Sequence, residues 1–273
     1  MKGVAQRTVR RFRSGALEAP AADDVVGEEP LEIRAAGETL AITMRTPGAD
    51  RELAVGFLFA EGVIASRDDV SSVAHCGRPD QPGFGNTIDV RPGGGAAFDI
   101  DRVSATRRGT LTTAACGVCG RRSVDDVLER CKPLPDGPMV AAQTIFAAVE
   151  GLRTRQPNFS RTGGIHAAAL LDSSGATLAA FEDIGRHNAL DKVVGALVLS
   201  ARLSEATLLV VSGRASFEVV QKASAAGVRI IASVSAASSL AIDLAVATRT
   251  TLCGFVRGEA MTVYSHAERI AGA

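Results

Sequence analysis

The spacing of apolar side chains divides the chain into parts with different local structure. Residues 31–44 alternate apolar and polar positions, which is typical of half-buried strands. The turn-forming residues 46–50 follow, with Asp50 as a candidate N-cap for a short helix over residues 52–60. Two more strands are predicted on either side of a glycine-rich stretch, at residues 87–90 and 98–100. The first part therefore predicts a small, mostly β unit.

Helical periodicity replaces this alternation in the middle of the chain. Ser123 can cap a helix that carries apolar side chains on one face, at Val124, Val127, Leu128 and Cys131. A second helix is predicted over residues 140–152, and Pro157 is expected to end it.

From residue 165 onward, strands and helices alternate. Strands are predicted at residues 165–171, 177–181, 207–211, 228–234, 252–255 and 261–264. Helices are predicted between them, at residues 190–197, 217–226 and 240–247. Such alternation implies parallel crossovers and a sheet covered by helices on both faces, with ligands at the carboxyl ends of its strands.

The length of 273 residues favours a main domain with a smaller one attached. We expect four parts: a flexible basic tail (1–27), a small β-rich subdomain (28–102), a cysteine-bearing loop with helices (103–158) and an α/β core (159–273). Arg10, Arg11 and Phe12 in the tail invite a twin-arginine export interpretation, but no apolar stretch follows them. A solvated tail is therefore favoured.

The composition limits which binding partners and which cellular compartment are expected for the protein. The 30 basic and 30 acidic residues cancel, which disfavours non-specific binding to nucleic acid. Hydrophobic residues make up 46% of the chain, yet no apolar run approaches a membrane span, so no membrane association is expected. Five cysteines, an odd number scattered along the chain, favour a reducing cytoplasm over a secreted disulfide framework.

The pair Cys116 and Cys119 is the strongest chemical signal. A glycine follows each cysteine, and Arg121 and Arg122 stand before the predicted helix. Positive charge and the amides of a helix N-terminus stabilise a thiolate, which is the nucleophilic form of cysteine. No second Cys-x-x-Cys or histidine pair is spaced to complete a zinc site, so a reactive pair is favoured over a structural metal.

The other three cysteines have different settings. Cys131 lies on the apolar face of its predicted helix and Cys253 inside a strand, so both are expected to be small core side chains. Cys76 follows His75 in a polar loop, and its role stays open.

Two further segments carry polar side chains next to predicted strands. One comprises residues 162–166 and ends on His166, and the other comprises residues 182–188. They fit a ligand site at a strand end. They fit a structural role equally well. In that interpretation Asn188 caps a helix, Asp183 pairs with Arg186, and His187 is hydrogen-bonded within the protein.

Two loops are candidate binding elements. Residues 212–216 follow a buried strand and open a helix, where free amides and the Arg214 guanidinium can hold a phosphate. An ordinary strand-to-helix turn with a serine cap has the same pattern. Residues 255–260 join the last two strands, with Gly258 permitting a tight turn, and on their own they predict only a hairpin.

Together and in this order, six segments resemble the formate dehydrogenase accessory sulfurtransferase family (FdhD). They stand at residues 44–48, 116–120, 162–166, 182–189, 212–216 and 254–257. The resemblance extends over residues 28–270. One departure is Ala-Ala-Ser-Ser-Leu at residues 236–240, where the family suggests Ala-Pro-Thr-Ser-Leu, which affects the expected loop shape.

This resemblance implies a fold and an activity. The fold would be α/β, with a cytidine-deaminase-like three-layer core and a smaller N-terminal β-rich subdomain. Cys116 would accept sulfur from a cysteine desulfurase as a persulfide, with Cys119 as its partner. The sulfur would then pass to the molybdenum bis(molybdopterin guanine dinucleotide) cofactor destined for formate dehydrogenase. Family members are described as homodimers.

The resemblance also implies where the cofactor would be held. The contacts would come from the last hairpin, at Phe255, Val256, Arg257, Gly258, Glu259 and Ala260. Local arginines such as Arg214 and Arg257 would bind an anionic cofactor on a surface without net charge. Guanine nucleotides would then act as mimics of the cofactor.

Three other functions compete with this one. A zinc deaminase needs a His-x-Glu upstream of its Cys-x-x-Cys, and the chain has none there. A dithiol oxidoreductase usually has a βαβ unit before its motif, and that context is missing. A chaperone that binds the guanine dinucleotide with idle cysteines differs from a sulfur carrier in whether Cys116 takes up sulfur.

Overall fold

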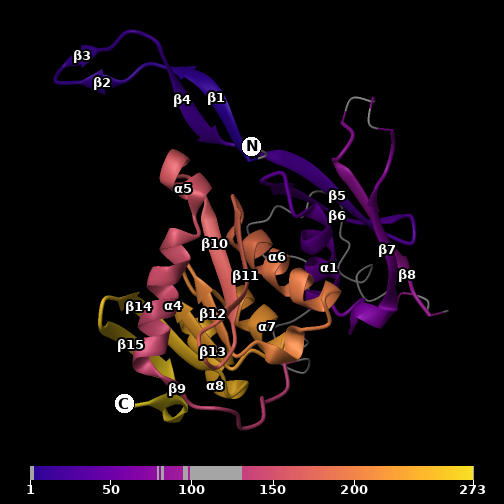
Figure 1. Cartoon of the computed structure of the whole chain (residues 1–273), viewed down its shortest axis with the longest axis vertical. Helices are drawn as coiled ribbons and strands as arrows, with labels where there is room; N and C mark the ends of the chain where they lie inside the picture. Colours follow the sequence, from indigo (N-terminus) through magenta and orange to yellow (C-terminus); the bar gives the residue numbers. More distant parts are fainter. Residues whose placement is uncertain (1–2, 79, 81–82, 95–97, 99–130, 273) are drawn as a thin grey trace.

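The computed structural model describes residues 3–78, 80, 83–94, 98 and 131–272. They form a mixed α/β structure with a larger six-stranded sheet and a smaller four-stranded sheet (Figure 1). The cysteine pair Cys116 and Cys119 and the helix expected from Ser123 lie outside the described residues. So do residues 99–100 of a predicted strand.

The larger sheet has the strand order β11-β10-β12-β13-β14-β15. Its strands are β10 (His166–Leu171), β11 (Thr177–Asp183), β12 (Leu208–Val211), β13 (Ile230–Ser233), β14 (Thr251–Arg257) and β15 (Ala260–Ser265). The central strands β12, β13 and β14 run parallel, as the alternation with helices predicted. The pairs β10 with β11, β10 with β12 and β14 with β15 are antiparallel. The expectation of parallel crossovers is therefore correct for the central strands, and the hairpin predicted at residues 255–260 is confirmed by the antiparallel pair β14 with β15.

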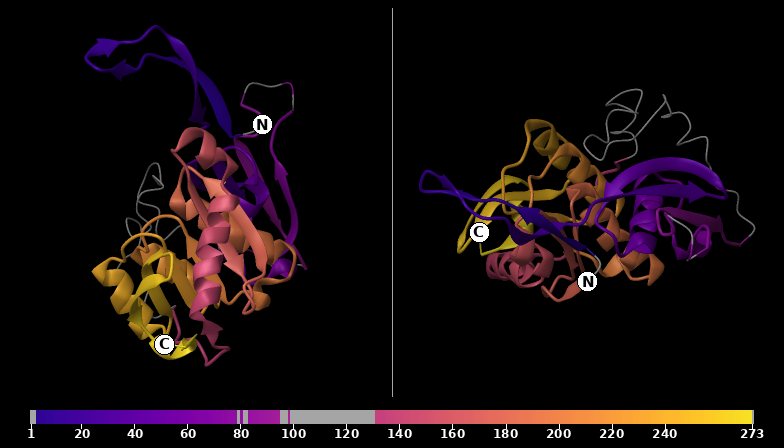
Figure 2. Two further views of the ribbon diagram at one scale, coloured as in Figure 1. Left: turned by 60° about the vertical axis from the view of Figure 1, so that its left-hand side comes forward. Right: turned by 90° about the horizontal axis from the view of Figure 1, so that it is seen from above.

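Helices cover both faces of this sheet, as predicted. Helix α4 (Ala142–Thr154) lies on one face, and α6 (Arg186–Leu199), α7 (Phe217–Ala225) and α8 (Ser239–Ala247) lie on the other (Figures 1 and 2). Successive strand side chains point to opposite faces. Leu208 accordingly belongs to the apolar cluster of α4, and its neighbour Leu209 to the cluster of α6.

Pro157 begins a helix instead of ending one. Helix α4 stops at Thr154, and α5 (Pro157–Thr162) starts on the proline, whose fixed φ suits the first helical position. The Glu182 carboxylate accepts hydrogen bonds from the amides of Asn158 and Phe159, at 3.0 and 2.8 Å, and so satisfies the free end of α5.

The smaller sheet has the order β6-β5-β8-β7. Its strands are β5 (Glu29–Ala35), β6 (Glu38–Arg45), β7 (Val70–His75) and β8 (Thr87–Pro92). Strand β7 escaped prediction because only Val70 and Val73 of its residues are buried. Helix α1 (Asp50–Ala60) packs on this sheet. Asp50 is its first residue and not its cap, because the N-cap is Ala49 and the Asp50 carboxylate pairs with Arg45.

Helix α1 joins the small unit to the core through a close crossing with α6. A Cβ atom on Gly56 would lie 1.9 Å from the carbonyl oxygen of Asp191, and one on Gly195 would lie 1.9 Å from the carbonyl oxygen of Glu52. Each helix therefore presents a glycine where the backbone of the other approaches it.

Part of the expected flexible tail forms a two-stranded ribbon. Strand β1 (Val4–Val9) pairs antiparallel with β4 (Ala21–Val26), and β2 (Phe12–Arg13) pairs with β3 (Ala16–Leu17) at its tip. The ribbon projects from the body of the molecule (Figures 1 and 2), and an ion pair of 2.7 Å between Asp24 and Arg161 attaches its base to α5. None of the residues of β1 is fully buried, so its sequence lacks the alternation by which strands are recognised.

Short elements complete the fold. They are the parallel pair β9 (Val140–Ala141) with β16 (Ile270–Ala271) and the 3-10 turns Arg67–Asp69, Leu203–Glu205 and Ala267–Arg269. Within the described ranges, no helix combines the length and the apolar character needed to cross a membrane.

Candidate functional site

The carboxyl ends of the central strands carry two candidate loops. Ser212 follows β12, and its hydroxyl accepts a hydrogen bond from the amide of Ala167 at 2.9 Å. The Ser233 hydroxyl at the end of β13 lies 2.7 Å from the carbonyl oxygen of Gly213. The amide of Phe255 in β14 donates to the carbonyl of Ser235 at 3.0 Å. These bonds place residues 212–216 and Phe255 along one edge of the sheet.

The last hairpin is built differently from a plain loop. Phe255 to Arg257 belong to β14, Gly258 and Glu259 make the turn, and Ala260 begins β15. Phe255 has a left-handed backbone with a φ of 52°, and the residue is 54% exposed. A bulky residue in this conformation is strained, and strain of this kind gathers at functional sites.

Val256 and Arg257 of this hairpin have opposite surroundings. Val256 is 1% exposed and packs in the apolar cluster of α4, so only its backbone can reach a ligand. The Arg257 side chain is exposed, as is that of Glu259. The hairpin therefore offers a ring, a guanidinium and main-chain groups to a ligand.

His166 and Arg186 come together at the same edge. A Cβ atom on Gly213 would lie 3.2 Å from Nδ1 of His166 and 3.7 Å from Cδ of Arg186. Burial and then the nearby Arg186 charge lower the pKa of His166, while Asp183 opposes them, so the imidazole is uncharged at neutral pH. His166 of residues 162–166 and Arg186 of residues 182–188 therefore lie together beside Gly213 of the loop 212–216.

Asp183 and Asn188 hold the small unit to the core. Asp183 is fully buried and forms an ion pair of 2.6 Å with Lys192. The same carboxylate accepts hydrogen bonds from the amide of Thr46 at 3.2 Å and from Asn188 at 3.0 Å. Nδ2 of Asn188 also reaches the carbonyl of Met44 at 2.8 Å. The expected ion pair of Asp183 with Arg186 is therefore wrong, and Asn188 lies inside α6 rather than at its cap.

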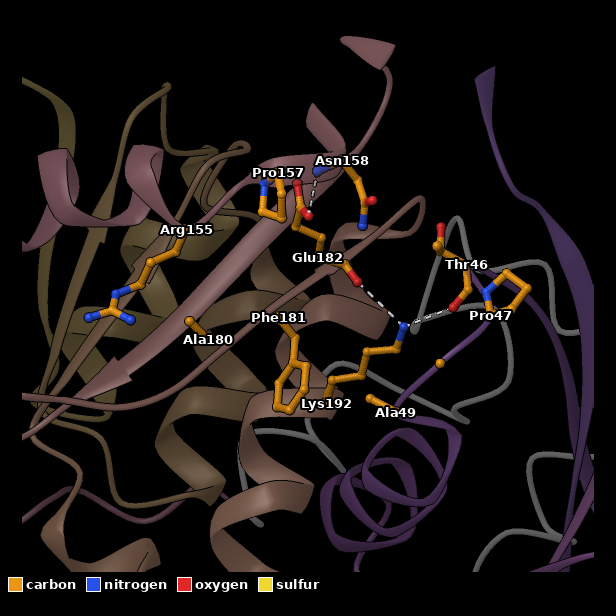
Figure 3. Close-up of a pocket in the computed structure, with 11 residues that line it drawn as sticks. Thr46, Pro47, Ala49, Arg155, Pro157, Asn158, Ala180, Phe181, Glu182 and Lys192 are labelled. Atoms are coloured by element: carbon orange, nitrogen blue, oxygen red, sulfur yellow. Dashed lines mark hydrogen bonds between the residues drawn. The ribbon is translucent and has the colours of Figure 1, made fainter. Parts of the chain in front are cut away.

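Lys192 completes this buried contact and lines a pocket. Its Nζ donates to the carbonyl oxygen of Thr46 at 2.9 Å and lies 3.4 Å from that of Glu182, as Figure 3 shows. The pocket has a volume of about 300 Å³. Its walls come from the small unit, from the end of α4 and start of α5, and from β11. Since Lys192 is already paired, its charge serves the fold here.

A second buried ion pair anchors the turn before α1. Arg45 is 2% exposed, and its Nε lies 3.0 Å from Oδ1 of Asp50. Its remaining nitrogens reach Glu29, the carbonyl of Gly85 and Asn86. A buried guanidinium needs such a set of acceptors to offset its lost hydration. The ion pair between Arg45 and Asp50 thus holds the two ends of this turn together.

His187 is satisfied within the protein, as the structural interpretation predicted. Its Nδ1 lies 3.0 Å from the Glu218 carboxylate, and its Nε2 lies 3.4 Å from the hydroxyl of Ser216. Glu218 also faces Lys222, which forms an ion pair of 2.6 Å with Asp191. Burial lowers the pKa of Lys222, but the two carboxylates outweigh burial and raise it, so this lysine stays charged.

Two of the described cysteines are core side chains, as predicted. Cys131 and Cys253 are buried, and burial raises the pKa of Cys253 to about 12. A thiol with that pKa has almost no thiolate at neutral pH. Cys76 is half-buried, and its role stays open.

One charged side chain of this region is not among the candidates that the sequence offers. Lys192 had a signal that was overlooked, because a charge stands between the buried residues Leu190 and Val193 of an apolar helix. Arg186 belongs to residues 182–188, for which the sequence leaves open a ligand site at a strand end and an ion pair with Asp183. Its position at the first turn of α6, facing Gly213, depends on the pairing of β10 with both β11 and β12.

The fold and these contacts define a mixed α/β protein in which a β-rich unit is fastened to a helix-covered sheet. The chain belongs to the FdhD/NarQ family, whose model matches residues 26–271. The family resemblance read from the sequence is thereby confirmed.

Relatives match almost the whole chain. A protein of Anaeromyxobacter dehalogenans named sulfur carrier protein FdhD is 56% identical over 98% of this chain and 93% of its own length. Proteins of the same name from Streptomyces coelicolor and Mycobacterium tuberculosis are 45% and 49% identical, over 97% and 89% of this chain and 95% and 90% of theirs. A crystal structure of a "putative formate dehydrogenase accessory protein" from Desulfotalea psychrophila has the same fold, with a TM-score of 0.77 and 24% identity over 98% of this chain and 99% of that one.

Proposed function

We propose that this protein is a cytoplasmic sulfur carrier that serves formate dehydrogenase. The observation that carries the proposal is the match of nearly the full chain to proteins named sulfur carrier protein FdhD, together with a Cys-x-x-Cys pair in the sequence. In this proposal Cys116 carries the sulfur and Cys119 assists it. A cysteine desulfurase is the donor, and the molybdenum bis(molybdopterin guanine dinucleotide) cofactor is the acceptor.

Loading requires no external oxidant. The Cys116 thiolate attacks the outer sulfur of the donor persulfide, the donor sulfur–sulfur bond breaks, and the donor cysteine leaves as a thiolate. In the release step the Cys119 thiolate would attack the inner sulfur of the Cys116 persulfide, so that the sulfur–sulfur bond breaks, the outer sulfur leaves as sulfide for the acceptor, and Cys116 and Cys119 are left as a disulfide that an external thiol reductant reopens. Flanking glycines leave the backbone around both thiols free to turn toward a partner.

The acceptor is proposed to lie against the last hairpin and the loop after β12. Exposed Arg214 and Arg257 supply positive charge, and the exposed ring of Phe255 supplies a surface for stacking. A homodimer is part of the same proposal. The likeness of the core to cytidine deaminases stays a prediction.

Incubation with a cysteine desulfurase and cysteine should add the mass of one sulfur atom to the protein, located on Cys116. The physical reason is that a thiolate near positive charge accepts sulfane sulfur, whereas a buried thiol does not. Intact-mass spectrometry followed by peptide mapping measures the addition, and a thiol reductant should remove it.

A Cys253→Ala variant is the matched control, because its thiol is buried in β14, and it should load like the unmodified protein. Equal loading of a variant with both Cys116→Ala and Cys119→Ala would refute the sulfur-carrier proposal. It would leave the cofactor-binding chaperone as the better description.

Guanine nucleotides should raise the melting temperature more than adenine nucleotides do. Selective binding to the folded state raises its stability with ligand concentration. Arg257→Ala should abolish the difference, because that guanidinium belongs to the proposed binding hairpin. Differential scanning fluorimetry at matched nucleotide concentrations measures both effects.

The control for this test is Arg202→Ala, which removes an exposed guanidinium that pairs with Glu205 before the start of β12. This variant should keep the guanine preference. Equal stabilisation of the unmodified protein by GDP and ADP would rule out the guanine site.

A further inference from the structure

A buried arginine at the amino ends of the central strands has no acceptor for its charge. Arg269 is 4% exposed, and its terminal nitrogens Nη1 and Nη2 are buried without a hydrogen-bond partner in the described part of the chain. A guanidinium stays charged in a protein, and a buried charge without a partner costs free energy. The fold therefore holds a group here that its described residues do not satisfy.

Two further arginines stand beside Arg269. Arg229 directly precedes β13 and Arg249 stands two residues before β14, so both lie at the amino ends of these parallel strands. The hydroxyl of Thr251 at the start of β14 donates to the carbonyl of His266 at 2.7 Å, which brings the turn with Arg269 to the same end. Burial is the main cause that lowers the pKa of Arg269, and the nearby charges of Arg249 and Arg229 act in the same direction.

The two nearby carboxylates are already engaged elsewhere. Glu268 precedes Arg269 in the chain, but its carboxylate lies 2.9 Å from Nδ1 of His266. Asp136 pairs with Arg249 at 2.6 Å. Both carboxylates oppose the effect of burial on the pKa of Arg269, yet neither forms a hydrogen bond with its terminal nitrogens. Three guanidiniums thus share two carboxylates, and the most buried guanidinium is left without an acceptor.

Asp136 indicates which kind of group these arginines bind. Its side chain is 87% exposed and belongs to residues 132–139, which form neither helix nor strand. The Arg229 side chain lies across this segment, because a Cβ atom on Gly137 would stand 2.4 Å from its Cδ. A carboxylate from an irregular, exposed segment is therefore already bound to one arginine of the cluster. The two terminal nitrogens of Arg269 match the two oxygens of a second carboxylate.

We propose that Arg229, Arg249 and Arg269 form a docking site for an acidic segment of a partner protein, one carboxylate of which binds Nη1 and Nη2 of Arg269. Asp136 is released from Arg249 when the segment binds, and this movement uncovers the buried nitrogens. Asp136 is thus an internal competitor of the partner. The site lies at the opposite ends of β13 and β14 from the loops proposed to hold the cofactor, so a partner can dock while the cofactor is bound.

Fluorescence polarisation with a labelled hexaglutamate peptide tests the site in the full-length protein. Arg269→Gln should weaken peptide binding about tenfold or more, the loss expected for hydrogen bonds to a charged group. Asp136→Asn should strengthen binding, because it removes the competing carboxylate from Arg249. Inorganic phosphate at the same concentration should displace the peptide less well than unlabelled hexaglutamate does.

A stability measurement separates docking from a structural role. Without peptide, Arg269→Met should raise the melting temperature by about 2 °C or more, because it removes a buried charge that has no acceptor, and it should also abolish peptide binding. An arginine that served only the fold would give the opposite shift. The matched control is Arg153→Gln, which removes an exposed guanidinium from the last turn of α4 and should leave both the affinity and the melting temperature unchanged.

Three results would overturn the docking site: no binding of hexaglutamate to the unmodified protein, an unchanged affinity in Arg269→Gln, or a melting temperature of Arg269→Met that does not rise. Stronger displacement by inorganic phosphate than by hexaglutamate would also overturn it, because the arginines would then be a phosphate site. These outcomes are independent of sulfur uptake by Cys116 and of the guanine preference, which depend on other residues.

Discussion

Lys192→Met is expected to lower the free energy of unfolding by about 4 kcal/mol, the range found when one member of a buried ion pair is removed. Asp183 would remain fully buried beside the small unit with its charge no longer compensated. Chemical denaturation followed by circular dichroism measures the change. The variant should also be cut more readily by a protease near Thr46, because the hydrogen bond from Lys192 to the Thr46 carbonyl, which joins the two units, would be lost.

A second substitution separates lost charge from lost packing. Adding Asp183→Asn to Lys192→Met removes the uncompensated charge and should recover part of the stability. The surface control is Arg202→Met, which breaks an exposed pair with Glu205 and should cost less than about 1 kcal/mol. A loss in Lys192→Met as small as in this control would show that the buried pair contributes nothing.

Gly195→Ala is expected to lower the free energy of unfolding by about 3 kcal/mol, toward the upper end for overpacking. The new methyl group would stand 1.9 Å from the carbonyl oxygen of Glu52, and a backbone atom in a helix cannot move aside as a flexible side chain can. Helices α1 and α6 would have to separate, which disturbs the apolar cluster that spans both units.

Gly151→Ala in α4 is the matched control for this glycine substitution. No atom lies within 4 Å of the Cβ position there, so alanine should raise stability by about 1 kcal/mol through its better helix propensity. Thermal and urea unfolding of both variants should therefore move in opposite directions. If both glycine variants gain stability, the helices are not in backbone contact.

The sequence predicts the alternating half of this molecule well and its charged contacts poorly. Helices such as α7 follow from local spacing, because their apolar face repeats with the helical period. Strand β12 follows from a continuous buried apolar run between turns. The ribbon β1–β4 and strand β7 lack such a face. Pro157 and Asp50 were misassigned because a proline or an acidic residue marks a helix boundary without telling on which side the helix lies.

The candidate site shows the same division between local and distant information. Residues 212–216 were recognised as a loop at a strand end, since strand, turn and helix are contiguous in the chain. The role of Asp183 could not be predicted, because its partner Thr46 is 137 residues away in the chain and the spacing of residues does not indicate that contact. Arg186 is part of a segment for which the sequence leaves a ligand site and a structural role open, and its position next to Gly213 follows only from the structure.

The contacts of Asp183 and Lys192 with Thr46, which join the small unit to the core, have a consequence for how the sequence can evolve. Asp183 and Lys192, which hold residue 46, flank Arg186 in the chain and fix the first turns of α6. A change at Arg45 or Thr46 would therefore tilt the helix that presents Arg186, although neither residue needs to touch a ligand. We therefore expect positions 44–46 and 183–192 to co-vary among homologues, since a substitution in one group would need a compensating substitution in the other to keep the edge of the sheet in place.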